Sequence, residues 1–596
     1  MKLSDYVVDF LARRGVDKAF AITGGASIHL IHSLGEHPDA GYICMHHEQA
    51  CGMAADAYAR VSKAGIGVAI ATSGPGATNL ITAIGCSWFD SIPVLYITGQ
   101  VTRFRFKGDT GVRQIGFQET DIVPMVQPIV KYAAQVTDPA MIRFELEKAL
   151  HIAKEGRPGP VLIDLPDDVQ RLDIDPASLQ GFSTPEHARA SELDDSIDRI
   201  LDLLAHAERP VLVTGAGIRL SGGELEIRTL QELLQIPVAP SWATMDMWPS
   251  DSPFTIGGFG THGTRAGNFA VQNADFILAV GARLSTRETG SPLSSWAREA
   301  RVAIVDIDAA ELAKFERFGK SVDVACKADA RDFLQAMIGR VESKNDLPAW
   351  PDWVQRIADW KSRYPVVSED QLSEQPINPY AFFSQINDIL ADDEIIFVDT
   401  GCSLAWLMQA FRFNGRQRAI HDFNNTAMGY ALPAAIGGWL AGDGRPVTCI
   451  VGDGSMMMNV QELATVASYK IPLKIIIINN NGYSMVQQTQ EQWLDSKYYA
   501  TSSEGGLQFP DFVALARSFG LPAIKVDAND SCIKRIEDQF ASNEAAVIDV
   551  HIDRWHRVIP QSRFGRPIED SEPLLERSEF LENMIVKPLD VSLEGK

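Results

Sequence analysis

Four consecutive isoleucines, at positions 475–478, lead directly into three asparagines. A continuous apolar run is typical of a parallel strand that is covered on both faces, whereas asparagine is unfavourable inside a strand. In doubly wound sheets the carboxyl ends of the strands open into the ligand-binding crevice. We therefore expect a core strand that ends here, with Asn480 facing a ligand and with Asn479 and Asn481 shaping the turn.

Similar short apolar runs alternate with helical patterns along the whole chain. They lie at 65–73, 93–99, 159–166, 209–217, 274–282, 301–308, 393–401, 445–454 and 473–481. Continuous apolar strands separated by helices indicate parallel sheets that are covered on both faces. The predicted fold class is therefore α/β, with three doubly wound parallel-sheet domains.

Two polar segments, 179–195 and 343–379, interrupt this alternation and suggest domain boundaries. The final segment, 557–596, has little strand character and is predicted to be a polar tail. The first and third domains share the same plan of strands that end in glycine loops, which suggests a duplication. The predicted domains are 1–178, 190–343 and 372–556.

The composition excludes several classes of partner. A net charge of −23 argues against a surface for nucleic acid or anionic lipid, because such surfaces depend on Lys and Arg. Seven cysteines without metal-ligand spacing predict reduced thiols and a cytoplasmic protein. No apolar run approaches the roughly 18 residues of a membrane helix, and the first residues lack a signal-peptide pattern. We expect no nucleic-acid partner and no membrane partner.

Asp453 and Asn480 are the strongest candidates for a ligand site. Each follows an apolar strand, and one strand–helix–strand unit separates them. An Asp carboxylate, an Asn amide oxygen and a backbone carbonyl are hard oxygen ligands that suit Mg²⁺. Gly454 lets the backbone approach a phosphate, and Ser455 can donate a hydrogen bond at a helix start. The alternative is a turn and an asparagine-rich loop without a ligand, which the presence of both halves disfavours.

The GDG sequence at 452–454 and the asparagines that follow resemble the thiamine diphosphate (ThDP) motif of the pyruvate decarboxylase and acetolactate synthase superfamily. The resemblance implies that Asp453, Asn480 and the carbonyl of Gly482 bind Mg²⁺, which carries the diphosphate. It also implies that Met428 holds the cofactor in a bent shape; packing in the core is the alternative for this residue. Further implied cofactor contacts are Asp399, Thr400, Gly401, Gly452, Gly454, Ser455 and Met485.

Glu48 begins a predicted helix rich in small residues. Close packing there would desolvate the carboxylate and perturb its pKa; the alternative is a glutamate favoured by the helix dipole. The segment resembles the family's HEQ signature, whose glutamate hydrogen-bonds the ThDP aminopyrimidine and so promotes loss of the C2 proton. The loop 73–79, with Pro75 and Asn79, resembles the segment beside that ring. In the family this glutamate and the metal site meet across a subunit interface, so the resemblance implies at least a homodimer with shared active sites.

Other segments resemble acetolactate synthases in particular. Gly25 lies in a glycine turn, Phe117 and Gln118 lie in a GFQET segment, and Lys131 matches a later lysine. The resemblance places all four near the reacting centre. Arg287 would bind the carboxylate of the acceptor keto acid, for which a guanidinium is well suited.

The middle of the chain resembles the flavin-binding part of these synthases. The resemblance implies bound FAD without a net redox role. The implied FAD contacts are Gly260, His262, Gly263, Thr264, Arg283, Asp306 and Asp308.

The chain departs from acetolactate synthases at two places. Ser285 and Thr286 replace an Asp-Asp pair, and Thr489 replaces a tryptophan that shapes the acceptor pocket. A smaller, more polar wall should admit a larger or more hydroxylated acceptor. A related branch of the family transfers the two-carbon unit of pyruvate to nucleotide-linked keto-deoxysugars, and this activity is an alternative.

We expect an enzyme that decarboxylates pyruvate and transfers the two-carbon acetaldehyde unit to an acceptor carbonyl compound, as acetolactate synthases do. A 2-keto acid decarboxylase is a further alternative, although its paired histidines would have to be His46 and His47, in a different position. A flavin-dependent pyruvate oxidase is another. A non-catalytic paralogue is disfavoured, because Glu48, Asp453 and Asn480 are all present.

Overall fold

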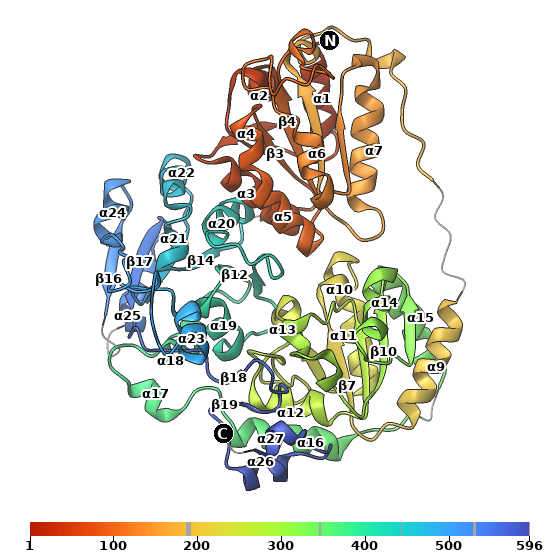
Figure 1. Cartoon of the computed structure of the whole chain (residues 1–596), viewed down its shortest axis with the longest axis vertical. Coiled ribbons are helices and arrows are strands. Elements are labelled where there is room, and N and C mark those ends of the chain that lie inside the picture. The colour runs from red at the N-terminus through yellow and green to blue at the C-terminus, as the bar shows by residue number, and fades with distance from the viewer. Residues whose placement is uncertain (186–191, 345–346, 443, 528–531, 595–596) are drawn as a thin grey trace.

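The computed structural model describes residues 1–185, 192–344, 347–442, 444–527 and 532–594. Three α/β domains surround the centre of the molecule (Figure 1), each built on its own parallel sheet. The predicted fold class is confirmed. No helix among the described residues is long and apolar enough to cross a membrane.

The N-terminal domain, at the top of Figure 1, has a six-stranded parallel sheet in the order β2-β1-β3-β4-β6-β5. Its strands are β1 (Lys18–Ala21), β2 (Gly41–Cys44), β3 (Gly67–Ala71), β4 (Val94–Gln100), β5 (Tyr132–Gln135) and β6 (Val161–Pro166). Its helices are α1 (Leu3–Ala12), α2 (Ile28–Glu36), α3 (Glu48–Val61), α4 (Pro75–Asn79), α5 (Ile81–Asp90), α6 (Ile122–Val126), α7 (Ile142–Lys154) and α8 (Asp167–Gln170). Separate hydrophobic cores on the two faces of this sheet make it a doubly wound layer.

The C-terminal domain, on the left of Figure 1, repeats this plan in the order β13-β12-β14-β15-β17-β16. Its strands are β12 (Ile395–Val398), β13 (Arg418–Ile420), β14 (Val447–Gly452), β15 (Lys474–Asn479), β16 (Ala523–Val526) and β17 (Ala546–His551). Its helices are α17 (Glu369–Ser373), α18 (Pro379–Ile386), α19 (Cys402–Ala410), α20 (Ala431–Ala441), α21 (Asp453–Met456), α22 (Leu463–Tyr469), α23 (Ser484–Trp493), α24 (Phe512–Ser518) and α25 (Cys532–Phe540). The shared strand order agrees with the duplication that the sequence suggested.

The isoleucine run forms the centre of the C-terminal sheet, in β15. Ile475 and Ile477 pack into the core on one face, and Ile476 and Ile478 pack into the core on the other. Ile478 pairs with Gly452 of β14, the residue before Asp453. The strand is therefore buried on both faces, and the polar residues begin at the carboxyl edge of the sheet, as predicted.

The central domain, on the right of Figure 1, has a five-stranded parallel sheet in the order β11-β10-β9-β7-β8. Its strands are β7 (Pro210–Thr214), β8 (Val238–Pro240), β9 (Phe276–Val280), β10 (Arg301–Asp306) and β11 (Val324–Lys327). Its helices are α9 (Leu193–Ala205), α10 (Ala216–Leu220), α11 (Glu224–Leu234), α12 (Arg265–Asn273), α13 (Thr286–Thr289), α14 (Ala309–Arg317), α15 (Ala330–Glu342) and α16 (Pro351–Arg363). Helix α16 lies within the segment predicted as a boundary, yet Trp353 and Trp360 extend the core of this domain.

The C-terminal segment 557–596 was predicted to be a polar tail, and this prediction is wrong for its described residues. It forms the strands β18 (Gln561–Ser562) and β19 (Ser571–Glu572) and the helices α26 (Arg577–Asn583) and α27 (Asp590–Leu593), which lie beside the central domain (Figure 1). Ile568 and Phe580 enter the central core, and Glu569 pairs with Arg298 at 2.7 Å. The polar groups of this segment form hydrogen bonds and an ion pair with the central domain, which accounts for its polar composition.

The outer domains meet through α3 and α20, whose backbones approach closely. A Cβ at Gly437 would lie 2.0 Å from the carbonyl oxygen of Ala54, so only glycine fits there. The Tyr430 hydroxyl, just before α20, donates to Asp56 Oδ1 at 2.6 Å. Residues of both helices belong to one continuous hydrophobic core, which fixes the two outer sheets relative to each other.

Candidate active site

Asp453 lies directly after β14 and contacts the loop that follows β15. Its Oδ2 accepts hydrogen bonds from the backbone N–H groups of Asn480 (3.1 Å) and Gly482 (3.2 Å). Its Oδ1 accepts one from the N–H of Gly454 at 2.6 Å. The neighbouring strands therefore bring the aspartate and the asparagine loop together, as their spacing predicted.

These oxygen atoms fit a hard cation. Burial raises the pKa of Asp453 to about 7, so the carboxylate lacks a counter-charge that a cation would supply. Asn480 donates its amide hydrogen to Ser484 Oγ, and no donor within the described part of the chain reaches its Oδ1. No three His, Cys, Asp or Glu side chains among the described residues form a metal site. A set of one carboxylate, one amide oxygen and the Gly482 carbonyl suits Mg²⁺.

Asp399 has a different use from the one predicted. Its carboxylate accepts hydrogen bonds from the backbone N–H groups of Thr400 (3.0 Å), Gly429 (3.1 Å) and Ala431 (2.9 Å). Burial raises its pKa to about 6. The Asp399 side chain is therefore occupied in holding the loop 421–430. The predicted diphosphate contact at this strand end stays a prediction for Thr400 and for Gly401, where α19 begins.

The remaining predicted diphosphate residues lie at the same edge of the sheet. A Cβ at Gly454 would lie 2.0 Å from the Tyr483 ring, so glycine is required at this turn. Gly452 and Ser455 flank Asp453 at the start of α21, and Met485 lies in the first turn of α23. Met428 is half-buried and belongs to none of the hydrophobic cores formed by the described residues, which disfavours the alternative of core packing.

Glu48 begins α3 at the carboxyl edge of the N-terminal sheet. Its Oε2 accepts a hydrogen bond from Asn79 Nδ2 at 2.9 Å, and a Cβ at Gly76 would lie 3.3 Å from its Oε1. Asn79 ends α4, which begins at Pro75. The loop 73–79 therefore positions the carboxylate. Glu48 is half-buried in the single chain, less desolvated than its small-residue helix suggested.

Two more predicted segments join this edge. Gly24 packs against Thr72, whose Oγ1 accepts the N–H of Ala26, so the turn at Gly25 lies beside the loop 73–79. Gln118 packs within van der Waals distance of Gly74 with a φ of +62°. Phe117 beside it is 82% exposed in the single chain.

Lys131 does not join this edge, contrary to the prediction. It lies just before β5, at the amino end of the strand, whereas Glu48 follows the carboxyl end of β2. Its ammonium group donates to the carbonyl oxygen of Glu155 at 2.5 Å, and burial lowers its pKa. Within the single chain Lys131 therefore lies away from Glu48, and the motif alone did not show on which end of the strand the lysine lies.

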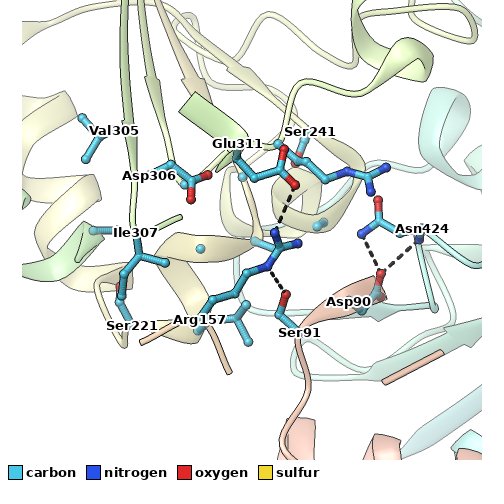
Figure 2. Close-up of a pocket in the computed structure, with 18 of the residues that line it drawn as sticks. Asp90, Ser91, Arg157, Ser221, Ser241, Val305, Asp306, Ile307, Glu311 and Asn424 are labelled. Carbon is cyan, nitrogen blue, oxygen red and sulfur yellow. Dashed lines mark hydrogen bonds and ion pairs between the residues drawn. The ribbon is translucent and has the colours of Figure 1, made fainter. Parts of the chain in front are cut away.

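A cavity of about 1030 Å³ opens where the central domain meets both outer domains. It lies beyond the carboxyl ends of the central strands, the usual ligand position in such sheets. Figure 2 shows Asp306 at the carboxyl end of β10 and Arg157 reaching from the N-terminal domain. The predicted residues that line it are His262, Arg283, Arg287 and Asp306.

Four predicted flavin residues support the wall of this cavity but do not line it. Thr264 caps α12 by accepting the N–H of Gly267, next to Gly263. Gly260, with a φ of +102°, donates its N–H to Asn268 at 2.7 Å. Asp308 caps α14. These residues shape the loops, while their neighbours face the cavity.

The lining of the cavity fits an anionic nucleotide. Arg283 Nε and His262 Nδ1 are buried without a hydrogen-bond partner among the described residues. Burial and the nearby Arg287 lower the pKa of His262 to about 4, so its ring stays neutral. Arg287 makes one hydrogen bond, to the carbonyl of Phe423 at 3.2 Å, and its guanidinium lies over Trp242. Phosphates or a carboxylate would satisfy the guanidinium donors of Arg283 and Arg287.

Comparison with known proteins agrees with this geometry. Residues 1–125, 197–337 and 399–550 match, in turn, the N-terminal TPP binding domain, the central domain and the C-terminal TPP binding domain of thiamine pyrophosphate enzymes. The chain is 38% identical to an acetolactate synthase large subunit of Parasynechococcus marenigrum, over 94% of this chain and 89% of that protein. The chain belongs to the acetolactate synthase family.

Two further relatives span archaea and plants. A probable acetolactate synthase large subunit of Methanocaldococcus jannaschii is 35% identical, over 93% of this chain and 92% of that protein. A chloroplastic acetolactate synthase 1 of Zea mays is 33% identical, over 96% of this chain and 88% of that protein. The family resemblance therefore covers all three domains of this thiamine diphosphate enzyme.

Within the acetolactate synthase family, this chain departs from the expected pattern at exposed or cavity-lining positions. Thr489 is exposed on α23, and Ser285 caps α13 together with Glu288 at the cavity wall. Neither residue is needed for the core, so both are free to alter what the site admits.

Glu119, to which the sequence analysis gave no role, also shapes the site. Glu119 accepts the backbone N–H groups of Lys107, Ile115 and Gly116, and so fixes the loop that carries Gln118. Burial alone would raise the pKa of Glu119. The three hydrogen bonds outweigh burial, so the pKa of this carboxylate lies below its usual value. The sequence signal for this role was the place of Glu119 within the GFQET segment.

Proposed function

We propose that the protein decarboxylates pyruvate and transfers the two-carbon unit to the carbonyl of an acceptor, as acetolactate synthases do, with Mg²⁺ and FAD bound as well as ThDP. The proposal is carried by one observation. The chain places the Glu48 carboxylate, held by Asn79, at the carboxyl edge of one α/β domain, and the buried Asp453 carboxylate beside the asparagine loop of a second domain of the same architecture. The relatives named above carry the same activity in their names.

Each residue has a defined part in this proposal. ThDP, when bound, supplies a nucleophilic carbon and an electron sink for decarboxylation. Glu48, oriented by Asn79, would handle a proton at its carboxylate beside the aminopyrimidine. Asp453, Asn480 and the Gly482 carbonyl would hold Mg²⁺, which would neutralise the diphosphate charge.

Arg287 is proposed to bind the acceptor carboxylate. Burial desolvates the guanidinium of Arg287 and lowers its pKa. Apart from its hydrogen bond to the Phe423 carbonyl, its N–H groups have no partner among the described residues and are free to bind a ligand. A bidentate pair with a carboxylate would use them. The cavity beside it has the volume and lining for FAD in a structural role.

The active enzyme is proposed to be at least a homodimer. Glu48 is half-buried and Phe117 is 82% exposed in the single chain, although both belong to the proposed reaction centre. A second subunit that brings its own diphosphate site would cover them and complete the site. Sedimentation with and without ThDP and Mg²⁺ measures this assembly.

Product identification tests the function. The purified enzyme receives pyruvate with ThDP, Mg²⁺ and FAD, alone or with 2-ketobutyrate, aldehydes or keto-sugars, and products are identified by mass. Acetolactate, or a mixed product with an added acceptor, supports the proposal. Acetaldehyde alone would indicate a decarboxylase, and oxygen uptake with pyruvate alone would indicate an oxidase; either result would refute it.

A second candidate is transfer to a nucleotide-linked keto-deoxysugar. Thr489 favours it, because this small polar side chain is exposed on α23 where the family pattern has a tryptophan. A preference for a keto-sugar over 2-ketobutyrate, measured as a ratio of kcat/KM, would select this candidate.

A further inference from the structure

The loop 421–430 joins β13 to α20 and carries Met428 toward the proposed ThDP site. Its start is held by a residue of another domain. Asp90, at the end of α5, accepts the backbone N–H groups of Phe423 (2.9 Å) and Asn424 (3.0 Å). It also accepts Asn424 Nδ2 at 2.7 Å and Arg60 Nη2 at 2.8 Å. One buried carboxylate of the N-terminal domain therefore fixes the entry of this loop.

Hydrogen bonds within the loop make its first part a compact turn that moves as one piece. The carbonyl of Asp422 accepts the N–H of Thr426 at 2.8 Å, and the Asp422 side chain accepts the N–H of Ala427 at 3.0 Å. Beyond Met428, Asp399 holds Gly429 as described above. Because the turn 422–427 is closed by these bonds, a shift at its start moves Met428 as well.

The same start of the loop forms a wall of the central cavity. Phe89, Asp90, Ser91, Phe423 and Asn424 all line it. Figure 2 shows Asp90 bonded to Asn424 on one side of this wall, and Arg157 joining Ser91 to Glu311 on the other.

Residues from all three domains meet at this wall. Arg287 of the central domain donates to the Phe423 carbonyl, and Arg157 pairs with Asp308 and Glu311 at 3.0 Å each. A ligand that fills the cavity therefore touches the residues that set the position of the loop.

We propose that Asp90 is a positioning residue that couples the two cofactor sites: a dinucleotide in the central cavity steadies the loop entry, and Asp90 passes this restraint to Met428, which tightens ThDP binding. The inference rests on the proposed function, which supplies the two ligands. Such a coupling is reciprocal, so ThDP must raise the affinity for the dinucleotide by the same factor. It assigns the flavin a role without electron transfer.

The experiment measures the ThDP dissociation constant twice, by tryptophan fluorescence at saturating Mg²⁺, in flavin-free enzyme and in enzyme saturated with FAD. The ratio of the two constants is the coupling factor. We expect about fivefold or more for the unaltered enzyme. The reverse titration, FAD with and without ThDP, should give the same factor.

Three variants separate positioning from a general loss of stability. Asp90→Asn should reduce the factor to about one, and Asn424→Ala, which leaves the Arg60–Asp90 ion pair, should reduce it partly. The matched control is Asp570→Asn. Asp570 is also buried and is paired with Arg566 and Arg577, and none of its hydrogen-bond or ion-pair partners among the described residues lies in the loop 421–430. This control should keep the full factor even if it unfolds at a lower temperature.

The outcomes are distinguishable. An unchanged factor in Asp90→Asn, or a factor of one in the unaltered enzyme, would overturn the coupling while leaving the carboligase proposal intact. No FAD binding at all would overturn the coupling and remove FAD from the proposed cofactors, without refuting the carboligase activity itself. Failure of the unaltered enzyme to bind ThDP with Mg²⁺ would overturn the proposed function, and the coupling with it.

Discussion

Replacing Gly437 with alanine should disrupt the contact between the outer domains. The new Cβ would lie 2.0 Å from the carbonyl oxygen of Ala54 and 2.7 Å from the carbonyl carbon. Such contacts require about 3.0 Å, so α3 and α20 must separate by roughly 1 Å. Both clashing atoms belong to the backbone of α3, inside a continuous core. Backbone atoms in a packed core cannot move aside as a flexible side chain can.

The magnitude follows from two opposing effects. Overpacking in a well-packed core costs about 1–3 kcal/mol, and the rigid backbone places this site at the upper end. Alanine regains about 1 kcal/mol of helix propensity relative to glycine. The net loss is about 2 kcal/mol, which lowers the midpoint of thermal unfolding by roughly 4–8 °C for a cooperative unit of 150–250 residues.

The matched control is Gly339→Ala in α15, where no atom lies within 4 Å of the added Cβ. This variant should unfold at the same temperature as the unaltered protein or a higher one. Calorimetry on both variants, with carboligase activity measured in parallel, checks the comparison. Activity should fall only in Gly437→Ala, because α3 carries Glu48. A Gly437→Ala protein that unfolds at the unaltered temperature would refute the reasoning.

Four further changes address the chemistry. Glu48→Gln should lower turnover by about 10²–10⁴-fold while ThDP titration stays nearly unchanged; full activity would contradict the proton role. Asp453→Ala should abolish Mg²⁺ and ThDP binding together, and unchanged ThDP affinity in calorimetry would remove Asp453 from the site. Arg287→Lys should raise the KM for 2-ketobutyrate by about tenfold, because a point charge replaces a bidentate fork; an unchanged KM would exclude the carboxylate contact. Burial raises the pKa of Asp164 to about 6, above the roughly 3.9 of an unfolded aspartate. The native state therefore binds this proton more tightly than the unfolded state does. As a result, the free energy of unfolding falls as the pH rises from about 4 to 6. Asp164→Asn should therefore make the unfolding temperature less dependent on pH between about pH 4 and 6. An unchanged pH dependence would contradict the raised pKa of Asp164.

The sequence predicted the features that depend on one strand and its ends. The isoleucines of β15 alternate between two cores, because a strand with period two and apolar residues on both faces has no other arrangement in a doubly wound sheet. Asp453 and Asn480 meet because adjacent parallel strands end at the same edge. Both inferences needed only local pattern and the rules of sheet topology.

Features that depend on which elements meet could not be predicted in this way. Lys131 was assigned to the reaction centre by its motif, but only the strand direction shows that it lies at the opposite edge. The segment 557–596 looked like a tail because its composition is polar. Asn268 and Asn273 of α12 supply its backbone partners, at Ile568 and Asn583, and nothing in the segment itself indicates them. Asp90 likewise acquires its role from a loop more than 300 residues away.

Helices α3 and α20 hold equivalent places in the two outer domains, since α3 follows β2, α20 follows β13, and these strands occupy the same position in the shared order. A contact between equivalent surfaces is isologous, the kind by which two copies of one domain pair about a twofold axis. Joined in one chain, the two copies meet at a high effective concentration. Each half can therefore diverge without losing its partner, one around Glu48 and the other around Asp453.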